Sequence, residues 1–423
     1  MSANSDYRVI PLDRLKQGTR LQCPIYDVRD DRNVLLLSAG TVISSSVIKR
    51  LSSRGISEIR AHCSELDGSS DSIPVAVEPL VVTESLPVPR ENSGFAVGPD
   101  SFIHNIKSRT GQRFDPEVRK EFSESYQQSL NFVEDLFGGL SKSERVDGSG
   151  LVSTSAQLLS QLSIDKDLFT ALGILPAADR YPMRHGLQTS MLAVALGTTL
   201  GLTESQLLEL STGCVVHDVG MLHISQAIYN AERSLTPIEF LEITKHPMLT
   251  FDLIRDVREL SSGARMVAYQ MHERCNSSGY PRKTNGKRIH YLAKVAAVAD
   301  VFIAMISPRP HRLGMLPYFA LKQIIEGARK GEFDPTVVRG LLQTISLFPI
   351  GSFIEVSDGR VGRVLRANRE NFARPVVELT NPHDLSSRTE IVDLSQVTSL
   401  EVVRPLRELP VHSVQMGTDI AWD

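Results

Sequence analysis

Two stretches of the sequence decide the fold: V-H-D-V-G from Val216 to Gly220, and H-E-R-C-N-S-S-G-Y-P from His272 to Pro281. A further charged residue, Asp300, follows inside an apolar run. Burial of its carboxylate without a partner would cost free energy. With two single histidines, these motifs contain six candidate metal ligands: His185, His217, Asp218, His246, His272 and Asp300. Histidine nitrogens and a carboxylate that can bridge two ions are what a two-metal site requires, so the set predicts a metal centre.

The wide spacing of the six ligands indicates that several helices carry them. Helical bundles assemble such sites from inward-facing side chains on neighbouring helices. Adjacent helical residues point about 100° apart, so His217 and Asp218 can share an ion only where a helix end faces the site. Gly220, just after the pair, favours such an end. A single histidine on a helix is more often a satisfied polar group than a ligand, so the prediction depends on the whole set.

The composition is that of a globular protein and excludes several classes. Of 423 residues, 41% are hydrophobic and 22% are charged, and the formal net charge is -3. This charge argues against a binder of nucleic-acid polymers, and no apolar run approaches the roughly 18 residues that span a membrane. The four cysteines show no C-x-x-C spacing and no secretory signal is visible, so we expect a cytoplasmic protein with reduced thiols.

Four regions follow from changes of pattern along the chain. Residues 1–63 alternate β-type runs with turns and one helical segment, which predicts a small α/β module. Residues 64–100 are rich in Ser, Pro and Val and predict a linker, with an added edge strand as the alternative. Residues 101–346 predict a helical domain, and residues 347–423 predict a small β extension with short valine-rich strands.

Signals for helix starts support the helical region. Asp115-Pro116 supplies an N-cap followed by proline at the first helical position. Thr203-Glu-Ser-Gln206 and Thr236-Pro-Ile-Glu239 have the spacing of capping boxes, in which the threonine and the fourth residue satisfy each other's backbone N–H groups.

In this order the motifs resemble the HD-GYP branch of the HD phosphohydrolases. The resemblance runs from about Tyr181 to Gly340 and depends on His217-Asp218, His246-Pro247, His272-Glu273-Arg274, Gly279-Tyr280-Pro281, Ala299-Asp300 and Arg309-Pro310-His311-Arg312. It implies a mainly α fold, a helical HD-type bundle flanked by a small N-terminal α/β module and a small C-terminal β module. It also implies hydrolysis of cyclic di-GMP, a cyclic dinucleotide, in bacterial second-messenger signalling.

The resemblance implies a role for each candidate residue. His185, His217, Asp218 and Asp300 would hold one divalent ion, iron or manganese, and Asp218, His246 and His272 a second. His217 and Asp218 would be the catalytic pair, because metal ions lower the pKa of bound water. Arg309, Arg312 and Tyr280 would contact the substrate, since guanidinium groups fit phosphate oxygens. A solvated, positively charged helix end is the alternative for the two arginines.

Several residues depart from the family pattern. Met271 stands where the family has a second histidine, and a thioether is a poor ligand for an iron or manganese site. Met221 and Ser234 replace lysines, and Tyr181 replaces a glutamate that accompanies a third ion in some members. These changes fall on the second ion and the phosphate end of the site, where each lost contact costs roughly 10²–10³ in rate.

Two functions are therefore compatible with the sequence. One is a metal-dependent cyclic di-GMP phosphodiesterase, weakened at its second ion. The other is a catalytically inactive relative that binds cyclic di-GMP or a signalling partner. The flanking modules suit either function, and both leave room for a homodimer. A helical scaffold without a ligand is the third interpretation, and the buried charge of Asp300 argues against it.

Overall fold

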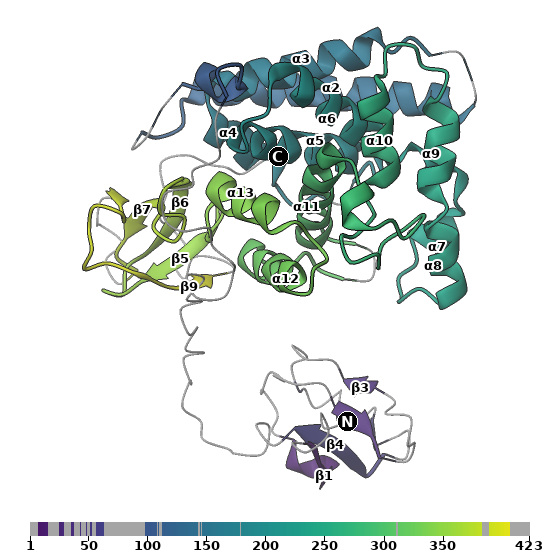
Figure 1. The fold of residues 1–423 in the computed structure, drawn as a ribbon. Coiled ribbons are helices and arrows are strands. Elements are labelled where there is room, and N and C mark those ends of the chain that lie inside the picture. The colour runs from purple at the N-terminus through teal and green to yellow at the C-terminus, as the bar shows by residue number, and fades with distance from the viewer. Residues whose placement is uncertain are drawn as a thin grey trace. The chain divides into compact units, whose positions relative to one another are not determined.

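The protein is described by a computed structural model of two compact units, Met1–Ala76 and Val77–Asp423. The described residues are 98–406, apart from 108, 110–111, 143, 145, 178, 310–311 and 383–388, together with parts of residues 7–62. The predicted linker at 64–100 lies outside them except for its last three residues. Figure 1 shows the fold of both units.

The first unit contains a small antiparallel sheet. Its strands are β1 (Tyr7–Pro11), β2 (Ile25–Asp27), β3 (Leu35–Leu37) and β4 (Glu58–His62), in the order β1-β4-β2-β3, with η1 (Leu12–Arg14) after β1. Its apolar core includes Ile25, Ile43 and Ile59, which are buried. The β-type runs of the sequence are therefore confirmed as strands of one sheet.

The second unit is dominated by helices. The helices are α2 (Pro116–Ser141), α3 (Ser149–Ile164), α4 (Lys166–Gly173), α5 (Met183–Thr199), α6 (Glu204–Val216), α7 (Gln226–Tyr229), α8 (Pro237–Ile243), α9 (His246–Ile254), α10 (Ser262–Gln270), α11 (Tyr291–Ile306), α12 (Pro317–Arg329) and α13 (Pro335–Ile345). Short 3-10 helices are η3 (Phe102–Asn105), η4 (Val219–His223) and η5 (Gly286–Arg288). None of the helices in the described part of the chain is long and apolar enough to cross a membrane.

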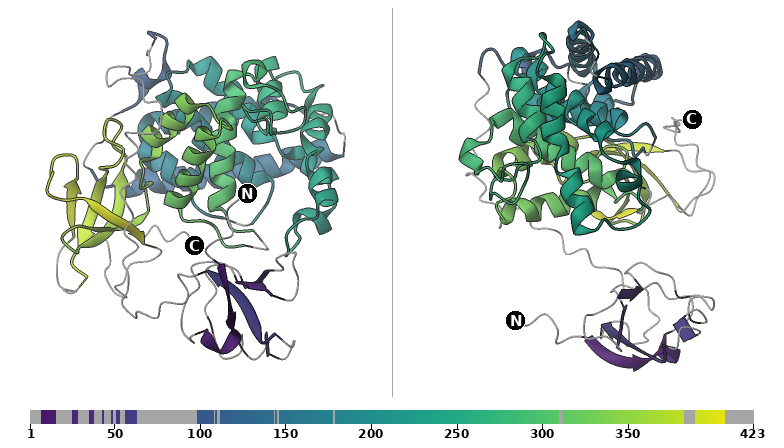
Figure 2. Two further views of the ribbon diagram at one scale, coloured as in Figure 1. Left: turned by 60° about the horizontal axis from the view of Figure 1, so that its bottom comes forward. Right: turned by 90° about the vertical axis from the view of Figure 1, so that its right-hand side faces the viewer.

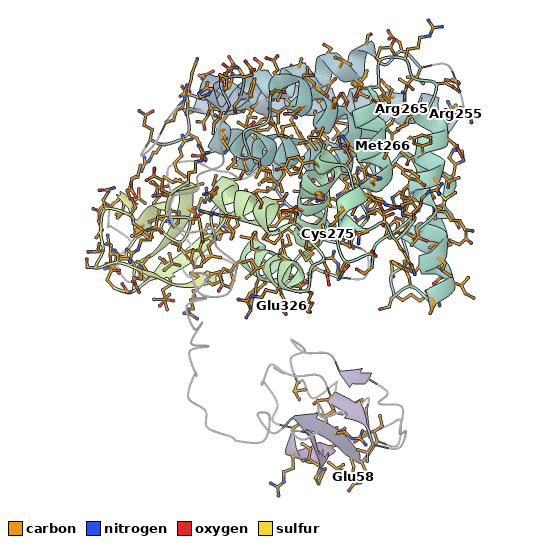
Figure 3. All side chains as sticks on the ribbon, viewed as in Figure 1. Glu58, Arg255, Arg265, Met266, Cys275 and Glu326 are labelled. Carbon is orange, nitrogen blue, oxygen red and sulfur yellow. The ribbon has the colours of Figure 1, made fainter. Side chains whose placement is uncertain are left out.

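The helix starts follow the sequence signals. The Asp115 side chain accepts from the first N–H groups of α2, and both predicted capping boxes form, at Thr203 for α6 and at Thr236 for α8. Helix α5 lies at the centre, where every residue from 185 to 199 is buried against α2, α4, α6, α11 and α13. Side chains fill the space between these helices (Figure 3). The predicted mainly α fold class is confirmed.

A five-stranded antiparallel sheet lies at one end of the bundle (Figures 1 and 2). Its strands are β5 (Phe353–Val356), β6 (Val361–Arg366), β7 (Val376–Thr380), β8 (Glu390–Asp393) and β9 (Val402–Leu406), in the order β8-β7-β6-β5-β9. The sequence predicts strands at 352–356, 360–366, 374–379 and 399–404, which correspond to β5, β6, β7 and β9, and it does not predict β8. Several buried residues of this sheet, among them Ile354, Val364 and Val377, belong to the same apolar cluster as α5 and α11, so the sheet and the helices share one core.

A buried ion pair joins the sheet to the helices. Arg366 on β6 is 1% exposed, and its Nη1 lies 2.5 Å from Oδ1 of Asp165, which also caps α4. The Arg366 Nε donates to the carbonyl of Gln112, and the guanidinium lies 4.3 Å from the centre of the Phe114 ring. These contacts link strand β6 to the segments just before α2 and α4.

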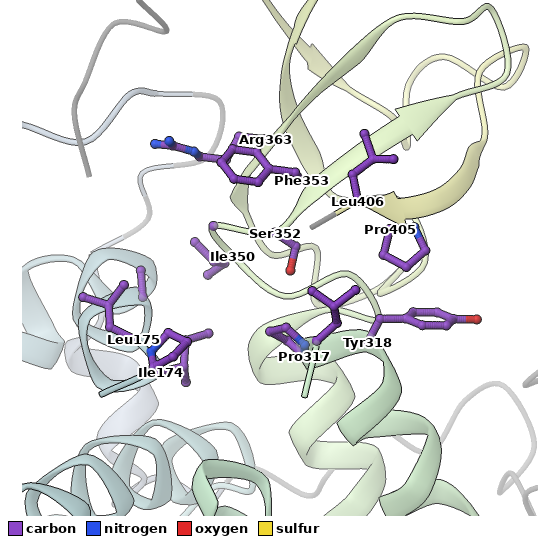
Figure 4. A pocket seen from close by; sticks show the side chains of 14 residues that line it. Ile174, Leu175, Pro317, Tyr318, Ile350, Ser352, Phe353, Arg363, Pro405 and Leu406 are labelled. Atoms are coloured by element: carbon purple, nitrogen blue, oxygen red, sulfur yellow. The ribbon is translucent and has the colours of Figure 1, made fainter. Parts of the chain in front are cut away.

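An apolar cavity of about 260 Å³ lies where α4, α12 and the sheet meet (Figure 4). Ile174, Pro317, Ile350 and Phe353 contribute to its walls, and the hydroxyl of Ser352 points toward its interior (Figure 4). It is separate from the residues that the sequence nominates for chemistry.

Candidate metal centre

Five segments bring the six predicted ligands together. His185 lies in the first turn of α5, His217 and Asp218 follow the end of α6, His246 begins α9, His272 follows α10, and Asp300 lies within α11. All six residues are buried, between 0% and 7% exposed. The expectation that the His217-Asp218 pair sits at a helix end is confirmed, since α6 stops at Val216 and turns into η4.

Close packing of η4 on α9 positions the His-Asp pair. A Cβ atom on Gly220 would lie 2.4 Å from the carbonyl oxygen of His246, so only glycine permits this approach. The Thr250 hydroxyl on α9 donates to the carbonyl of His217 at 2.8 Å and accepts from the N–H of Gly220 at 3.0 Å. These contacts hold His246 beside Asp218.

Three imidazoles surround one oxygen of Asp218. The Nε2 atoms of His246, His217 and His272 lie 3.2, 3.3 and 3.9 Å from Asp218 Oδ1. The other oxygen, Oδ2, accepts from the Tyr181 hydroxyl at 3.1 Å. The geometry leaves one carboxylate oxygen facing histidine nitrogens only.

Asp300 has its own set of histidines. Its Oδ1 lies 2.9 Å from His185 Nε2 and 3.7 Å from His217 Nε2, and its Oδ2 lies 3.4 Å from His272 Nδ1. The carboxylate that seemed costly in the sequence therefore has imidazole neighbours on both oxygens. His217 and His272 each face both aspartates, which makes one continuous cluster.

The free nitrogens of the cluster fit a metal. The Nδ1 atoms of His217 and His246 lie 2.7 and 2.8 Å from the carbonyls of Cys214 and Ile243, which fixes both rings. Among the described residues, the Nε2 atoms of His217, His246 and His272 have no hydrogen-bond partner although they are buried. Metal-bound histidines are oriented in this way by a carbonyl on the opposite nitrogen.

Two trios of the described residues could each hold an ion. In one, His185, His217 and Asp300 offer ligand atoms within 4.8 Å of one another; in the other, His217, Asp218 and His272 do. His246 completes neither trio but reaches the Asp218 oxygen. The buried histidines and aspartates thus form groups that could bind a divalent metal.

The protonation states of the cluster suit metal binding. Burial alone would raise the pKa of the Asp218 carboxyl, but the surrounding histidines outweigh burial and lower it well below its usual range. Asp300 behaves in the same way, with His272 and His185 as the main opposing groups. Burial lowers the pKa of His217, and it lowers the pKa of His246 to about 3 against the opposing charge of Asp218. Ionised carboxylates and neutral imidazoles are the forms that bind metals.

The predicted substrate contacts lie in different surroundings. The Tyr280 ring stacks on His272, with centres 5.0 Å apart and planes 12° from parallel. The Arg309 guanidinium lies 4.1 Å from the centre of the Tyr181 ring, which borders the cluster. The Arg312 guanidinium instead donates to the carbonyls of Ala304, Met305 and Ser307 at the end of α11. Arg312 therefore caps a helix, a role closer to the alternative that the sequence left open.

Comparison with known proteins supports the same assignment. Residues 174–337, which contain all six ligands, match the HD domain family. This region is an HD domain. The predicted resemblance is confirmed for the part of the chain that carries the motifs.

Several relatives of this chain are named as phosphodiesterases. The cyclic di-GMP phosphodiesterase PA4108 of Pseudomonas aeruginosa is 29% identical over 226 residues, 53% of each chain. The cyclic di-GMP phosphodiesterase PdeB of Borreliella burgdorferi is 21% identical over 310 residues, 70% of this chain and 80% of that protein. The 3'3'-cGAMP-specific phosphodiesterase 3 of Vibrio cholerae is 26% identical over 252 residues, 58% of this chain and 53% of that protein. The chain thus spans about half the length of the first and third relatives.

Among solved structures, the HDG"Y"P protein Bd1817 of Bdellovibrio bacteriovorus matches with a TM-score of 0.46 and 17% identity. The match covers 79% of this chain and 98% of that chain.

Glu273 lies within one of the sequence motifs, but the sequence alone assigns it no role. Glu273 is 3% exposed, and its two carboxylate oxygens accept from the N–H groups of Arg282 and Thr284 at 2.8 and 2.9 Å. The loop after Gly279-Tyr280-Pro281 is thereby tied to the residue next to His272. The sequence signal was a charged residue beside a predicted ligand, which alone does not say what it binds.

The two methionines of the altered motifs are both buried. Met271 is 0% exposed and belongs to the apolar cluster of α5 and α11, and Met221 on η4 is 2% exposed. The apolar side chain at position 271 is therefore part of the core of the HD domain.

Proposed function

We propose that this protein is a metal-dependent phosphodiesterase of the HD-GYP type, which hydrolyses cyclic di-GMP. The observation that carries the proposal is the convergence of four histidines on two buried aspartates, with three imidazole nitrogens left unpaired among the described residues. The names of the relatives support the substrate class, because they act on cyclic di-GMP or 3'3'-cGAMP.

Two ions, of iron or manganese, would share the cluster. His185, His217, Asp218 and Asp300 would hold the first, and Asp218, His246 and His272 the second. When bound, such ions neutralise phosphate charge and lower the pKa of water. The ordinary preference of iron and manganese for nitrogen and oxygen ligands matches this set.

The protein's own residues would prepare the site for substrate. Asp218 and Asp300 stay ionised because the histidines lower their pKa values. Burial, reinforced by the charge of Asp218, raises the pKa of Tyr181 well above its usual value, so its hydroxyl stays protonated and donates to Asp218 Oδ2. That bond orients the carboxylate, and its Oδ1 is left for the imidazole side. Arg309, beside Tyr181, supplies a positive charge for the phosphate.

A second candidate is a protein that binds cyclic di-GMP without turning it over. The favouring observation is that apolar side chains occupy positions 221 and 271, buried at 2% and 0% exposure. A site with one histidine and one lysine fewer would keep its first ion and lose transition-state contacts. Docking of a signalling partner belongs to this candidate as well.

The decisive experiment combines metal analysis with a hydrolysis assay. Full-length protein is loaded with iron or manganese, its metal content is measured, and linear dinucleotide and GMP are quantified. Stoichiometric metal and linear product support the enzyme. Cyclic di-GMP binding with metal but no product selects the binding protein, and protein without metal or nucleotide binding contradicts both. Asp300→Asn is the matched variant, because it removes a carboxylate charge with little change of shape.

A further inference from the structure

Helix α8 exposes an unusual amount of apolar surface beside the site. It has only seven residues, and three of them are large and apolar with exposed fractions of 74% for Ile238, 52% for Phe240 and 61% for Leu241. Single exposed apolar side chains need no explanation, but three on one short helix call for one.

Of these three, Phe240 has a ring contact with a residue next to the metal centre. Its ring lies 6.3 Å from that of Tyr280, at 86° to it. Tyr280 in turn stacks on His272, 5.0 Å away and nearly parallel. A line of aromatic rings therefore runs from a metal-site imidazole to a half-exposed phenyl ring.

The helix that presents Phe240 is held rigidly at its start. Glu239 closes the capping box with the backbone N–H and hydroxyl of Thr236, and it accepts two bonds from the Arg233 guanidinium at 2.7 and 2.8 Å. Such bidentate pairs fix geometry as well as charge. Phe240 is therefore carried by a helix whose first turn is already fixed, which reduces the entropy lost when a ligand binds.

The Tyr181 ring, which also borders the metal centre, is less accessible to a planar ligand than the Phe240 ring. The Tyr181 ring has the Arg309 guanidinium 4.1 Å from its centre and the Tyr229 ring 6.0 Å away. A guanidinium at that distance covers one ring face. The Phe240 end therefore has the more accessible aromatic surface of the two.

We propose that Phe240 stacks on one nucleobase of the substrate while the adjacent phosphate lies at the His-Asp centre. This inference builds on the proposed function. In a cyclic dinucleotide one sugar separates each base from a phosphate, so a phosphate at the cluster brings a base to a nearby ring. Every base has a π face, so Phe240 supplies affinity without choosing between guanine and adenine.

The test measures binding with a stacking-sensitive probe. A cyclic dinucleotide that carries 2-aminopurine in place of one guanine is titrated into metal-loaded full-length protein, in parallel with unlabelled cyclic di-GMP. Phe240→Ala should weaken both affinities by about 5- to 150-fold, the range that corresponds to one base stacked on an aromatic ring. It should also relieve the quenching of 2-aminopurine fluorescence. Phe240→Trp should retain both, whereas Phe240→Leu should behave like the alanine variant.

Matched controls come from the same helix. Ile238→Ala and Leu241→Ala remove exposed aliphatic side chains, which have no ring to stack on a base, and they should leave the affinity unchanged. Metal content and thermal unfolding verify that each variant is intact. Unchanged affinity in Phe240→Ala, equal losses in the two controls, or full retention by Phe240→Leu would overturn the stacking role. If wild-type protein binds no cyclic dinucleotide, the proposed function itself fails, which is a different result.

Discussion

The Thr250 hydroxyl gives a sharp test of how the site is held together. It is 0% exposed and joins two backbone groups, the carbonyl of His217 and the N–H of Gly220, to helix α9. Thr250→Val keeps the shape of the side chain and removes both bonds. Each buried group left unsatisfied costs about 1–3 kcal/mol, and the two losses are not fully additive, so we expect about 2–4 kcal/mol of destabilisation.

Thr198→Val is the matched control. Thr198 is also 0% exposed, but its hydroxyl donates to the carbonyl of Val194 four residues earlier in α5. A helix carbonyl of this kind already accepts a backbone bond, so loss of the hydroxyl should cost less than about 1 kcal/mol. Urea unfolding of the two variants beside wild type, with slopes compared to verify that the transition is unchanged, measures the difference.

Metal binding should be affected in the same order as stability, more by Thr250→Val than by Thr198→Val. Since Thr250 holds the end of α6 against the start of α9, its loss loosens the approach of His246 to Asp218, now 3.2 Å. Thr250→Val should therefore also bind less metal, and Thr198→Val should not. Equal destabilisation by the two variants, or wild-type stability and metal content in Thr250→Val, would refute the reasoning.

Three further predictions use the same buried groups. The free energy of unfolding of the metal-depleted protein should fall as the pH drops from about 6.5 toward 3. His246 contributes at most about 1.4 kcal/mol per pH unit to this fall. The reason is that His246 takes up a proton near pH 6.5 in the unfolded chain but only near pH 3 in the native state. Asp218 adds to this loss at the acid end, and a flat pH profile in urea unfolding would contradict both assignments. Met271→His should destabilise the metal-depleted protein by about 1–3 kcal/mol, because it buries an imidazole in an apolar cluster, and added metal should restore stability if the ring reaches the site. Asp165→Asn keeps a capping oxygen for α4 but leaves Arg366 as a buried, poorly paired charge; unfolding should become easier by about 3–5 kcal/mol, and a cost under 1 kcal/mol would show that the pair does not anchor the sheet.

The sequence was enough to predict which histidines and aspartates lie together, because buried charged residues are easy to recognise in it. A carboxylate within an apolar run, such as Asp300, and a polar pair after one, such as His217-Asp218, both signal buried charges that need partners. Local rules also placed the capping boxes of α6 and α8, because the bonds involved span only three residues. In these cases the physical cause lies within one short segment.

The parts that the sequence missed depend on contacts between distant segments. Glu273, Thr250 and Arg366 look like ordinary polar residues until the chain brings their partners near, and those partners lie 9, 33 and 201 residues away. Strand β8 was missed for a related reason. Its four residues, Glu390–Asp393, form a strand only because they pair with β7. Arg312 shows the converse, since this charged residue of a matching motif donates to carbonyls at the end of the preceding helix, α11.

The burial of Met271 also bears on how this HD domain departs from its family. Met271 is 0% exposed and lies within the main apolar cluster, where close packing stabilises the fold. Asp218 keeps three imidazole neighbours and Asp300 keeps His185, His217 and His272. The first candidate trio, His185, His217 and Asp300, contains neither residue 271 nor its neighbour His272. If the proposed two-ion site forms, we therefore expect the change at position 271 to reduce binding of the second ion before that of the first.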